Sequence, residues 1–263
     1  MSISAREIKT RIRSMESAKQ ITKAMETVAT SKLEKGKNQL FAARPYFQTL
    51  RQTVEDLAAF GCLQSRPVNK SVYIVIAGDR GLAGGYNSNI LKAALADMEN
   101  KNAMVLPIGK KAVAFFKHPT ECTAEHMTSD DCLAVAKALC EQYFAEEVDE
   151  IVLAYTEYVS ALSQVPRIIE LLPLKQTKKQ YNSDTIYEPD RETVLKAFIP
   201  EYVGGMLYCA LCESRAAEQA ARRMAMDSAA KNADEMIENL RTQFNRNRQA
   251  AITGQIVDIV AGL

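Results

Sequence analysis

The sequence contains one helical stretch that is too long to be buried inside the chain's own fold. Between residues 206 and 253 it runs 48 residues without a glycine or a proline. An unbroken helix of that length extends roughly 70 Å at about 1.5 Å per residue. A compact globule of 263 residues has a radius of gyration of only about 18 Å. We therefore expect this helix to project as a rod that a partner molecule grips.

The N-terminal segment shows a second helical pattern. No glycine or proline occurs before Gly36, and Pro45 predicts a kink before the pattern ends at Gly61 and Pro67. Apolar residues recur every three or four positions along one face, namely Ile8, Ile12, Met15, Ala18, Ile21, Met25 and Val28. The pattern predicts one long, bent helix over residues 1–61.

A similar apolar stripe marks a C-terminal helix over residues 200–263. Its members are Ala233, Ile237, Leu240 and Phe244, and then Ile252, Ile256, Ile259 and Leu263. Spacing that averages about 3.5 residues predicts a left-handed coiled coil. Because both terminal helices return to the same central domain, we expect the pair to be antiparallel. Its seam is rich in alanine and methionine, and small seam residues bury little area, so we expect support from a partner.

Residues 70–190 have a different pattern, in which strands alternate with helices. The predicted strands are 71–78, 104–109, 150–159 and 165–174, and the predicted helices are 88–98, 110–117 and 129–147, with Ser129 as the cap of the last one. The short connection at 160–164 suits a hairpin. This order predicts a small Rossmann-like α/β domain whose mostly parallel sheet ends in an antiparallel pair. Residues 175–184 are polar and predict a loop.

Charge and composition limit the classes of partner. A net charge of +1 gives no general case for nucleic-acid binding, but residues 1–60 hold eleven Lys or Arg against six Asp or Glu, which favours an acidic partner.

The chain has no run of 18 apolar residues and no signal-peptide pattern, so we expect a cytoplasmic protein without a membrane span. Free thiols are then expected for Cys62, Cys122, Cys132, Cys140, Cys209 and Cys212.

Three local patterns allow chemistry without requiring it. The loop at residues 78–87 follows a strand and opens a helix, as phosphate-binding loops do, but it fits neither glycine-rich pattern and lacks a Walker lysine. A tight structural turn that displays Asp79 and Arg80 is the other interpretation. His118, Cys122 and His126 have the spacing of metal ligands on one helical face, but Pro119 interrupts a helix there.

The remaining pattern is a CxxC pair, Cys209 and Cys212, which lies in a helical stretch without a second pair to complete a zinc site. Two buried thiols are the simpler interpretation. His118 and His126 are the chain's two histidines, which excludes a histidine-based triad elsewhere. We therefore expect a chain that is not an enzyme on its own and that needs no cofactor.

Three segments together resemble one family. They are QITKAMETVATSKL at residues 20–33, GDRGLAGGYN at 78–87, and ESRAAEQAARRMAMDSAAKNADEMIENLRTQFNRNRQAAITGQIVDIV at 213–260. In order and spacing they closely resemble the gamma subunit of the rotary ATP synthase, across nearly the whole chain.

The resemblance implies a rotor subunit of the central stalk. One copy per complex would enter a head of alpha and beta subunits with its coiled coil, while the α/β domain would meet epsilon and the membrane ring of c subunits, with delta elsewhere in the complex. Ion-driven rotation would then be coupled to ATP synthesis or hydrolysis in beta. The location implied is the cytoplasmic side of a bacterial cell membrane, bound only through the complex.

The resemblance also implies partner-binding residues. Arg248 and Gln249 match a polar pair that contacts a loop of beta, and Tyr208 matches a tyrosine near the foot, where the family meets the c ring and epsilon. Residues matching the loop expected near the acidic C-terminal region of beta are Arg80, Gly81, Leu82 and Ala83. The basic residues of the N-terminal helix suit the same acidic region by charge, namely Arg13, Lys23 and Lys32.

The sequence also departs from the family's pattern. Gly254 stands near the end of the last helix and predicts a softer tip, and Gly204 and Gly205 stand where polar residues are common in the family. Two other functions fit parts of the chain. One is a nucleotide-binding α/β enzyme that uses the loop at 78–87, and the other is a coiled-coil scaffold that homodimerises through its rods.

Overall fold

The computed structural model describes residues 5–58, 67–119, 122–174, 188 and 190–262. It divides into two compact units, one made of residues 1–30 with 222–263 and the other of residues 31–221. Helices α1 (Ala5–Ala58) and α5 (Arg191–Ala261) each contribute to both units. Helix α1 continues through Gly36 and Pro45, and α5 includes Pro200 and both glycines at 204 and 205. The predicted loop at 175–184 and Cys62 lie outside the described residues.

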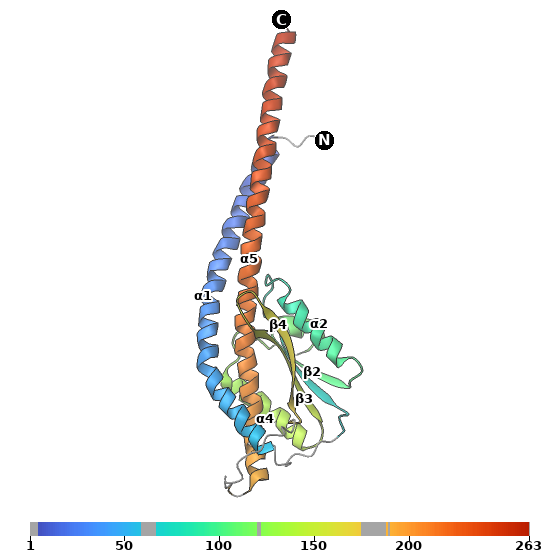
Figure 1. The fold of residues 1–263 in the computed structure, drawn as a ribbon. Coiled ribbons are helices and arrows are strands. Elements are labelled where there is room, and N and C mark those ends of the chain that lie inside the picture. Colours follow the sequence, from blue (N-terminus) through green and yellow to red (C-terminus); the bar gives the residue numbers. More distant parts are fainter. Residues whose placement is uncertain (1–4, 59–66, 120–121, 175–187, 189, 263) are drawn as a thin grey trace. The chain divides into compact units, whose positions relative to one another are not determined.

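The second unit is built on a four-stranded sheet. Its strands are β1 (Ser71–Ile76), β2 (Ala103–Ile108), β3 (Glu150–Tyr158) and β4 (Gln164–Leu172), in the order β2-β1-β3-β4. Strand β1 runs parallel to β2 and β3, whereas β3 and β4 are antiparallel (Figure 1). The predicted α/β fold with a mostly parallel sheet that ends in an antiparallel pair is therefore confirmed.

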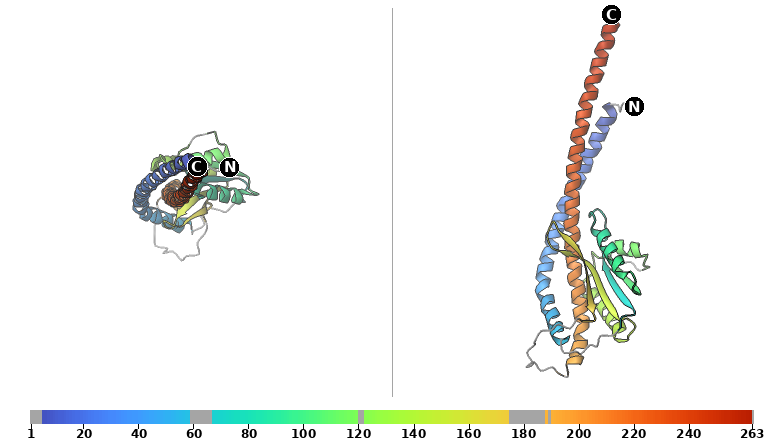
Figure 2. Two further views of the ribbon diagram at one scale, coloured as in Figure 1. Left: turned by 90° about the horizontal axis from the view of Figure 1, so that it is seen from above. Right: turned by 45° about the vertical axis from the view of Figure 1, so that its right-hand side comes forward.

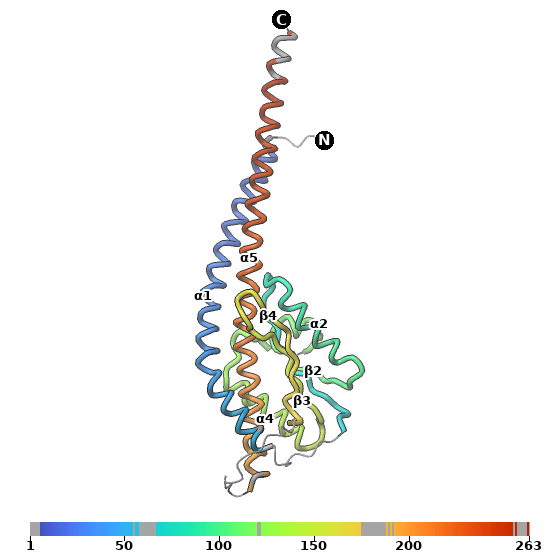
Figure 3. Tube along the Cα trace, in the orientation of Figure 1, coloured from blue at the N-terminus to red at the C-terminus, as the bar shows by residue number. Residues whose placement is uncertain are grey.

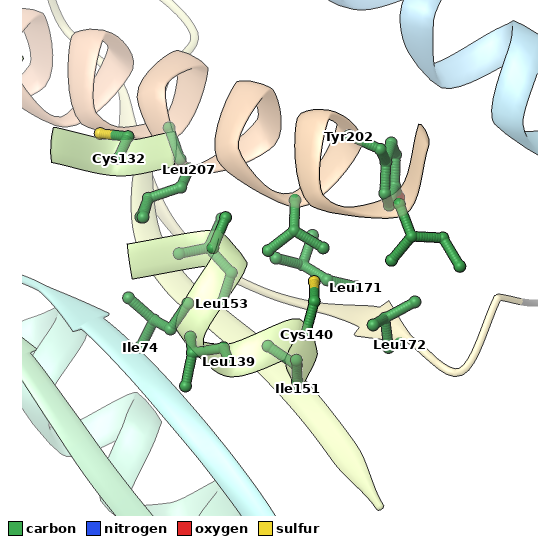
Figure 4. Packing of buried hydrophobic residues seen from close by; sticks show 14 of the residues in the cluster. Ile74, Cys132, Leu139, Cys140, Ile151, Leu153, Leu171, Leu172, Tyr202 and Leu207 are labelled. Atoms are coloured by element: carbon green, nitrogen blue, oxygen red, sulfur yellow. The ribbon is translucent and has the colours of Figure 1, made fainter. Parts of the chain in front are cut away.

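Alternate residues of β1 supply two hydrophobic layers, one on each face of the sheet. Tyr73 and Val75 pack with α2 (Tyr86–Met98) and α3 (Lys110–Phe116). Ile74 packs on the opposite face with α4 (Ser129–Phe144) and α5. Figure 4 shows this second layer, in which Leu207 of α5 lies among residues of the sheet and of α4. Because both faces are covered, β1 is buried along its whole length.

The first half of α5 is a core helix of the second unit. Apolar residues at every fourth position are fully buried in the same layer, namely Leu195, Ile199, Val203, Leu207 and Leu211. Within the described residues, Glu192–Gly254 is long and apolar enough to cross a membrane by length and composition. The burial of Leu195, Ile199, Val203, Leu207 and Leu211 is the arrangement expected of a core helix in a globular unit.

Two adjacent glycines let other helices approach α5 closely. A Cβ at Gly204 would lie 3.1 Å from the Cα of Leu133 in α4, and one at Gly205 would lie 2.8 Å from the ring of Phe47 in α1. Close packing against α4 and α1 therefore explains why glycine occupies positions 204 and 205, where polar residues are common in the family.

Helix α4 begins one residue from the expected cap. Thr128, rather than Ser129, is the N-cap, and its hydroxyl accepts a hydrogen bond from the main-chain N–H of Asp131. The Asp131 carboxylate accepts the N–H of Thr128 in return, which completes a capping box.

The first unit is an antiparallel pair of helices (Figure 3). Ion pairs link Lys19 to Asp234 at 2.6 Å and Glu16 to Arg241 at 2.8 Å, so residue numbers rise along one helix as they fall along the other. Along α5 the least exposed positions follow a four-three alternation, namely Met226, Ala230, Ala233, Ile237, Leu240, Phe244 and Asn247. That alternation is the seam of a coiled coil.

The seam of α1 differs in two positions from the apolar stripe in the sequence. Its members are at least half-buried and are Ile8, Ile12, Met15, Ala18, Thr22, Met25 and Ala29. Thr22 and Ala29 thus replace Ile21 and Val28, whose side chains are 61% and 58% exposed. A seam repeats every 3.5 residues on average, and this spacing selects Thr22 and Ala29. The side chains of Ile21 and Val28 therefore face outward.

We predict that Gly109→Ala destabilises the second unit by about 3 kcal/mol, because backbone strain alone costs roughly 1–3 kcal/mol. Gly109 has φ of 96°, and an added Cβ would overlap the carbonyl oxygen of Ala77. Urea unfolding followed by circular dichroism measures the change. Gly81→Ala is the matched control, since a Cβ there meets no atom within 4 Å. Equal stability of the two variants would contradict the assigned strain.

Candidate partner-binding surfaces

The loop at residues 78–87 is closed by a side chain of its own. The main-chain N–H of Gly78 donates to Asn87 Oδ1 at 2.8 Å, and Asn87 Nδ2 donates to the carbonyl oxygen of Arg80 at 3.1 Å. Leu82 has a φ of 61°, which is strained for a leucine, and it is 64% exposed. Packing does not account for that conformation, so the loop holds a large apolar side chain outward.

Asp79 anchors this loop to two other segments. Its carboxylate accepts main-chain N–H groups of Lys110 at 3.0 Å, Ala124 at 3.1 Å and Glu125 at 2.8 Å. The sequence interpretation that the turn displays Asp79 is therefore wrong, whereas Arg80 is displayed, with its side chain 72% exposed. The carboxylate thus binds the first amide of α3, which is a different helix from α2, the helix that the loop itself opens.

Two residues suggested separately as partner-binding share one carboxylate. Lys32 Nζ lies 2.6 Å from Glu125 Oε1, and Arg80 Nη2 lies 3.5 Å from Glu125 Oε2. The ion pair with Lys32 lowers the pKa of Glu125. Two cations against one anion leave a local excess of positive charge, and all three side chains are well exposed. We name Lys32, Arg80 and Glu125 the basic cluster.

The rest of the 80–83 segment divides into exposed and buried positions. Gly81 is exposed, and Leu82 points to solvent. Ala83 is 2% exposed and packs with Tyr86 and Ala217 of α5. Arg80, Gly81 and Leu82 are therefore available to a partner, whereas Ala83 holds the loop on α5.

The suggested residues of the first unit lie on its surface. Arg13 is exposed, and Lys23 donates to Glu26 Oε2 at 2.8 Å, a contact that raises the pKa of Lys23. Arg248 and Gln249 are exposed near the end of α5. These four residues belong to the first unit, whereas the basic cluster belongs to the second.

Tyr208 is half-buried on α5 in the second unit. Its ring centroid lies 6.0 Å from that of Phe47, and the interaction with Cys212 and partial burial raise its pKa. The residue is thus held in place by packing, with part of its surface open to solvent.

The cysteines have the properties of structural thiols. Burial raises the pKa of Cys209 to about 12 and also raises the pKa of Cys212, so neither thiol forms a reactive thiolate readily. All five cysteines in the described part of the chain are free. Among the described residues no group of three His, Cys, Asp or Glu side chains can hold a metal ion.

Sequence reasoning missed the residues that join the surface loops to one another. Arg215 of α5 donates to the carbonyl oxygens of Ala124 and Met127, which fixes the segment that carries Glu125. The chain gives no local signal for these contacts, because the partners lie 88 and 91 residues apart.

Solved structures share this fold. The chain aligns with a subunit of the Euglena gracilis mitochondrial ATP synthase at a TM-score of 0.73 and 20% identity, covering 98% of this chain and 93% of that one. A central-stalk/c-ring structure from Tetrahymena thermophila gives 0.64 and 24% identity, covering 80% and 99%. The fold is therefore that of an ATP synthase central-stalk subunit.

Sequence comparison identifies the family. The family model described as ATP synthase matches residues 4–263. The ATP synthase gamma chain of Alkaliphilus metalliredigens is 41% identical over 100% of this chain and 98% of its own length, and that of Ruminococcus albus is 41% identical over 97% and 96%. The chain belongs to the ATP synthase gamma chain family, whose members are non-catalytic subunits of that complex.

We predict opposite roles for two adjacent loop residues. Asp79→Ala should lower the free energy of unfolding by about 2–3 kcal/mol, because three amides lose a charged acceptor. Arg80→Ala should leave it nearly unchanged, because its ion pair is exposed. Urea unfolding of the purified variants measures both. A large loss in Arg80→Ala, or none in Asp79→Ala, would contradict the assignment of Asp79 as the anchor.

Proposed function

We propose that the chain is the rotor of its ATP synthase, and that it couples ion-driven rotation of the membrane c ring to conformational change in the catalytic beta subunits. The observation that supports this most directly is the outward position of Ile21 and Val28. These residues lie on a helix that already pairs through its other face, so their exposure calls for a surrounding partner.

The two side chains define a face rather than isolated positions. A spacing of seven residues is two helical turns, so Ile21 and Val28 point in nearly the same direction. Contiguous apolar surface on a soluble protein marks an interaction site. The hydrophobic contact that would cover it is non-directional, which suits a shaft that turns against its socket.

The end of α5 supplies a second contact. Extending the pairing of Glu16 with Arg241 and of Lys19 with Asp234 puts Ala5 opposite residues about 248–252. Figure 2 shows α5 continuing past the start of α1. Arg248 and Gln249 therefore lie where the described helices cease to overlap, and we propose that they contact a loop of beta at the tip of the shaft.

The positive charges support an acidic region of beta as a further contact. The basic cluster has an excess positive charge, and the exposed side chain of Leu82 lies two residues after Arg80 in the same loop. Arg13 and Lys23 add exposed positive charge on α1. Attraction between oppositely charged surfaces chiefly accelerates association and sets the orientation of the two partners. We therefore propose that these basic residues orient the chain against beta.

The assembly follows from the same assignment. One copy per complex would pair with alpha and beta through the first unit and through the basic cluster of the second. Tyr208 would lie at the foot that meets epsilon and the c ring, and delta would belong to the same complex. The chain would be peripheral on the cytoplasmic side of the bacterial membrane, attached only through its partners.

The coupling needs asymmetry rather than chemistry on this chain. A ligand that contacts three similar subunits differently favours a different conformation in each one, because it shifts each equilibrium by its differential contact energy. A pair of helices is not symmetric about its long axis, and exposed apolar residues such as Ile21 and Val28 make it such a ligand. Turning it would move that bias from one beta subunit to the next.

We predict that Ile21→Ser combined with Val28→Ser weakens assembly with alpha and beta by about 10- to 100-fold, because two covered side chains lose their burial. The unfolding of the isolated chain should be nearly unaffected, since both residues are exposed. Reconstitution with purified alpha and beta, followed by titration of complex formation, measures the affinity.

Ile8→Ser is the matched control, because Ile8 is 1% exposed in the seam. This substitution should destabilise the coiled coil of the isolated chain, because it places a hydroxyl in the buried seam. If the outward double variant assembled and supported ATP synthesis like the parent chain, the proposed covering of Ile21 and Val28 would be wrong.

A further inference from the structure

The basic cluster contains a carboxylate of its own, which lies against both of its cations. Glu125 Oε1 is 2.6 Å from Lys32 Nζ, and Glu125 Oε2 is 3.5 Å from Arg80 Nη2. Lys32 belongs to α1, Arg80 to the loop at 78–87, and Glu125 to the segment before α4. The fold thus places an acid from a third segment between two basic residues that are far apart in the sequence.

The main chain around Glu125 holds this acid in place. The N–H of Glu125 donates to Asp79 Oδ2 at 2.8 Å, and the carbonyl oxygen of Ala124 accepts Arg215 Nε at 2.8 Å. The ion pair with Lys32 lowers the pKa of Glu125, so its carboxylate is charged at neutral pH. Glu125 therefore keeps its position through contacts that its own side chain does not make.

Both cations can still bind a second carboxylate. Their side chains are 42% exposed for Lys32 and 72% exposed for Arg80. An ammonium group has three N–H donors and a guanidinium group has five, so the contacts with Glu125 leave donors on each. An acidic partner would offer these donors the same chemical group that Glu125 already supplies, and the two carboxylates would compete.

We propose that Glu125 is an internal competitor for the acidic region of beta, which occupies Lys32 and Arg80 in the free chain and releases them when partner carboxylates bind. This inference rests on the proposed function, in which the basic cluster contacts beta. The exchange requires little free energy, because the Glu125 side chain is 39% exposed and exposed ion pairs contribute little to stability. Competition keeps the contact weak and reversible, which suits a rotor that meets one beta subunit after another.

Glu125→Gln tests the proposal, because it removes the charge and nearly preserves the shape. Stopped-flow mixing of the full-length chain with purified alpha and beta measures the rate of association. At low salt this variant should associate about three- to tenfold faster than the parent chain, because both cations would then attract the partner without an opposing carboxylate. The gain should shrink as salt is raised, since exposed charges are screened.

Glu192→Gln is the matched control for the change in net charge. Its carboxylate is also paired, at 2.7 Å from Lys196 Nζ, and it lies in the first turn of α5. That turn is roughly 35 Å along the helix from Arg215, which holds the segment of the cluster. Association of this variant should therefore match that of the parent chain.

The double variant Lys32→Gln with Arg80→Gln separates this inference from the proposed function. If it associates as fast as the parent chain, the basic cluster does not contact beta, and the contact and the competition are both wrong. If it associates more slowly while Glu125→Gln is unchanged or slower, only the competition is wrong, and Glu125 instead positions the two cations. Adding Glu125→Gln to the double variant should give no more gain than Glu192→Gln does, and a larger gain would overturn the proposal.

Discussion

The second unit depends on one contact, the packing of α5 against the sheet. Burying apolar side chains such as Leu195, Val203 and Leu211 stabilises by about 1.5–3 kcal/mol each before entropy is counted. With the helix fixed in this way, its polar residues become attachment points. The hydroxyl of Ser214 accepts the main-chain N–H of Thr156 in β3, and its carbonyl oxygen accepts the hydroxyl of Tyr86 at the start of α2. Arg215 donates to carbonyl oxygens of the segment before α4. Loops far apart in the sequence are thus joined through one turn of one helix.

The sequence predicts the elements of this fold because each has a local signal. β-branched runs mark the strands, and the absence of glycine and proline marks the rod. The seam of α1 is only partly predictable, since Ile21 and Thr22 both lie close to the ideal repeat. Hydrophobicity favours Ile21, whereas the 3.5-residue period selects Thr22. The pattern could not reveal that the more apolar residue faces outward, because it assumes that apolar residues serve the chain's own core.

The basic cluster shows where sequence reasoning about sites ends. Lys32 and Arg80 are identifiable singly, from charge and from resemblance, but their shared contact with Glu125 spans 93 and 45 residues. Asp79 illustrates the opposite problem. A glycine-rich loop predicts display of its polar side chains, yet here the carboxylate is turned toward three amides from neighbouring segments. Which amides are near is set by the start of α3 and by the segment between α3 and α4, which no local pattern records.

In the first unit the small apolar side chains lie in the seam and larger ones face solvent, which favours the proposal that a partner stabilises this unit. Four seam positions are alanines, Ala18, Ala29, Ala230 and Ala233, whereas larger side chains face solvent, namely Ile21, Val28, Met236, Ile252 and Ile256. Because burial energy scales with apolar area, a partner that covers the outer residues would add more stabilisation than the alanine positions of the seam. Such contacts lack direction, so they do not fix a partner in one orientation.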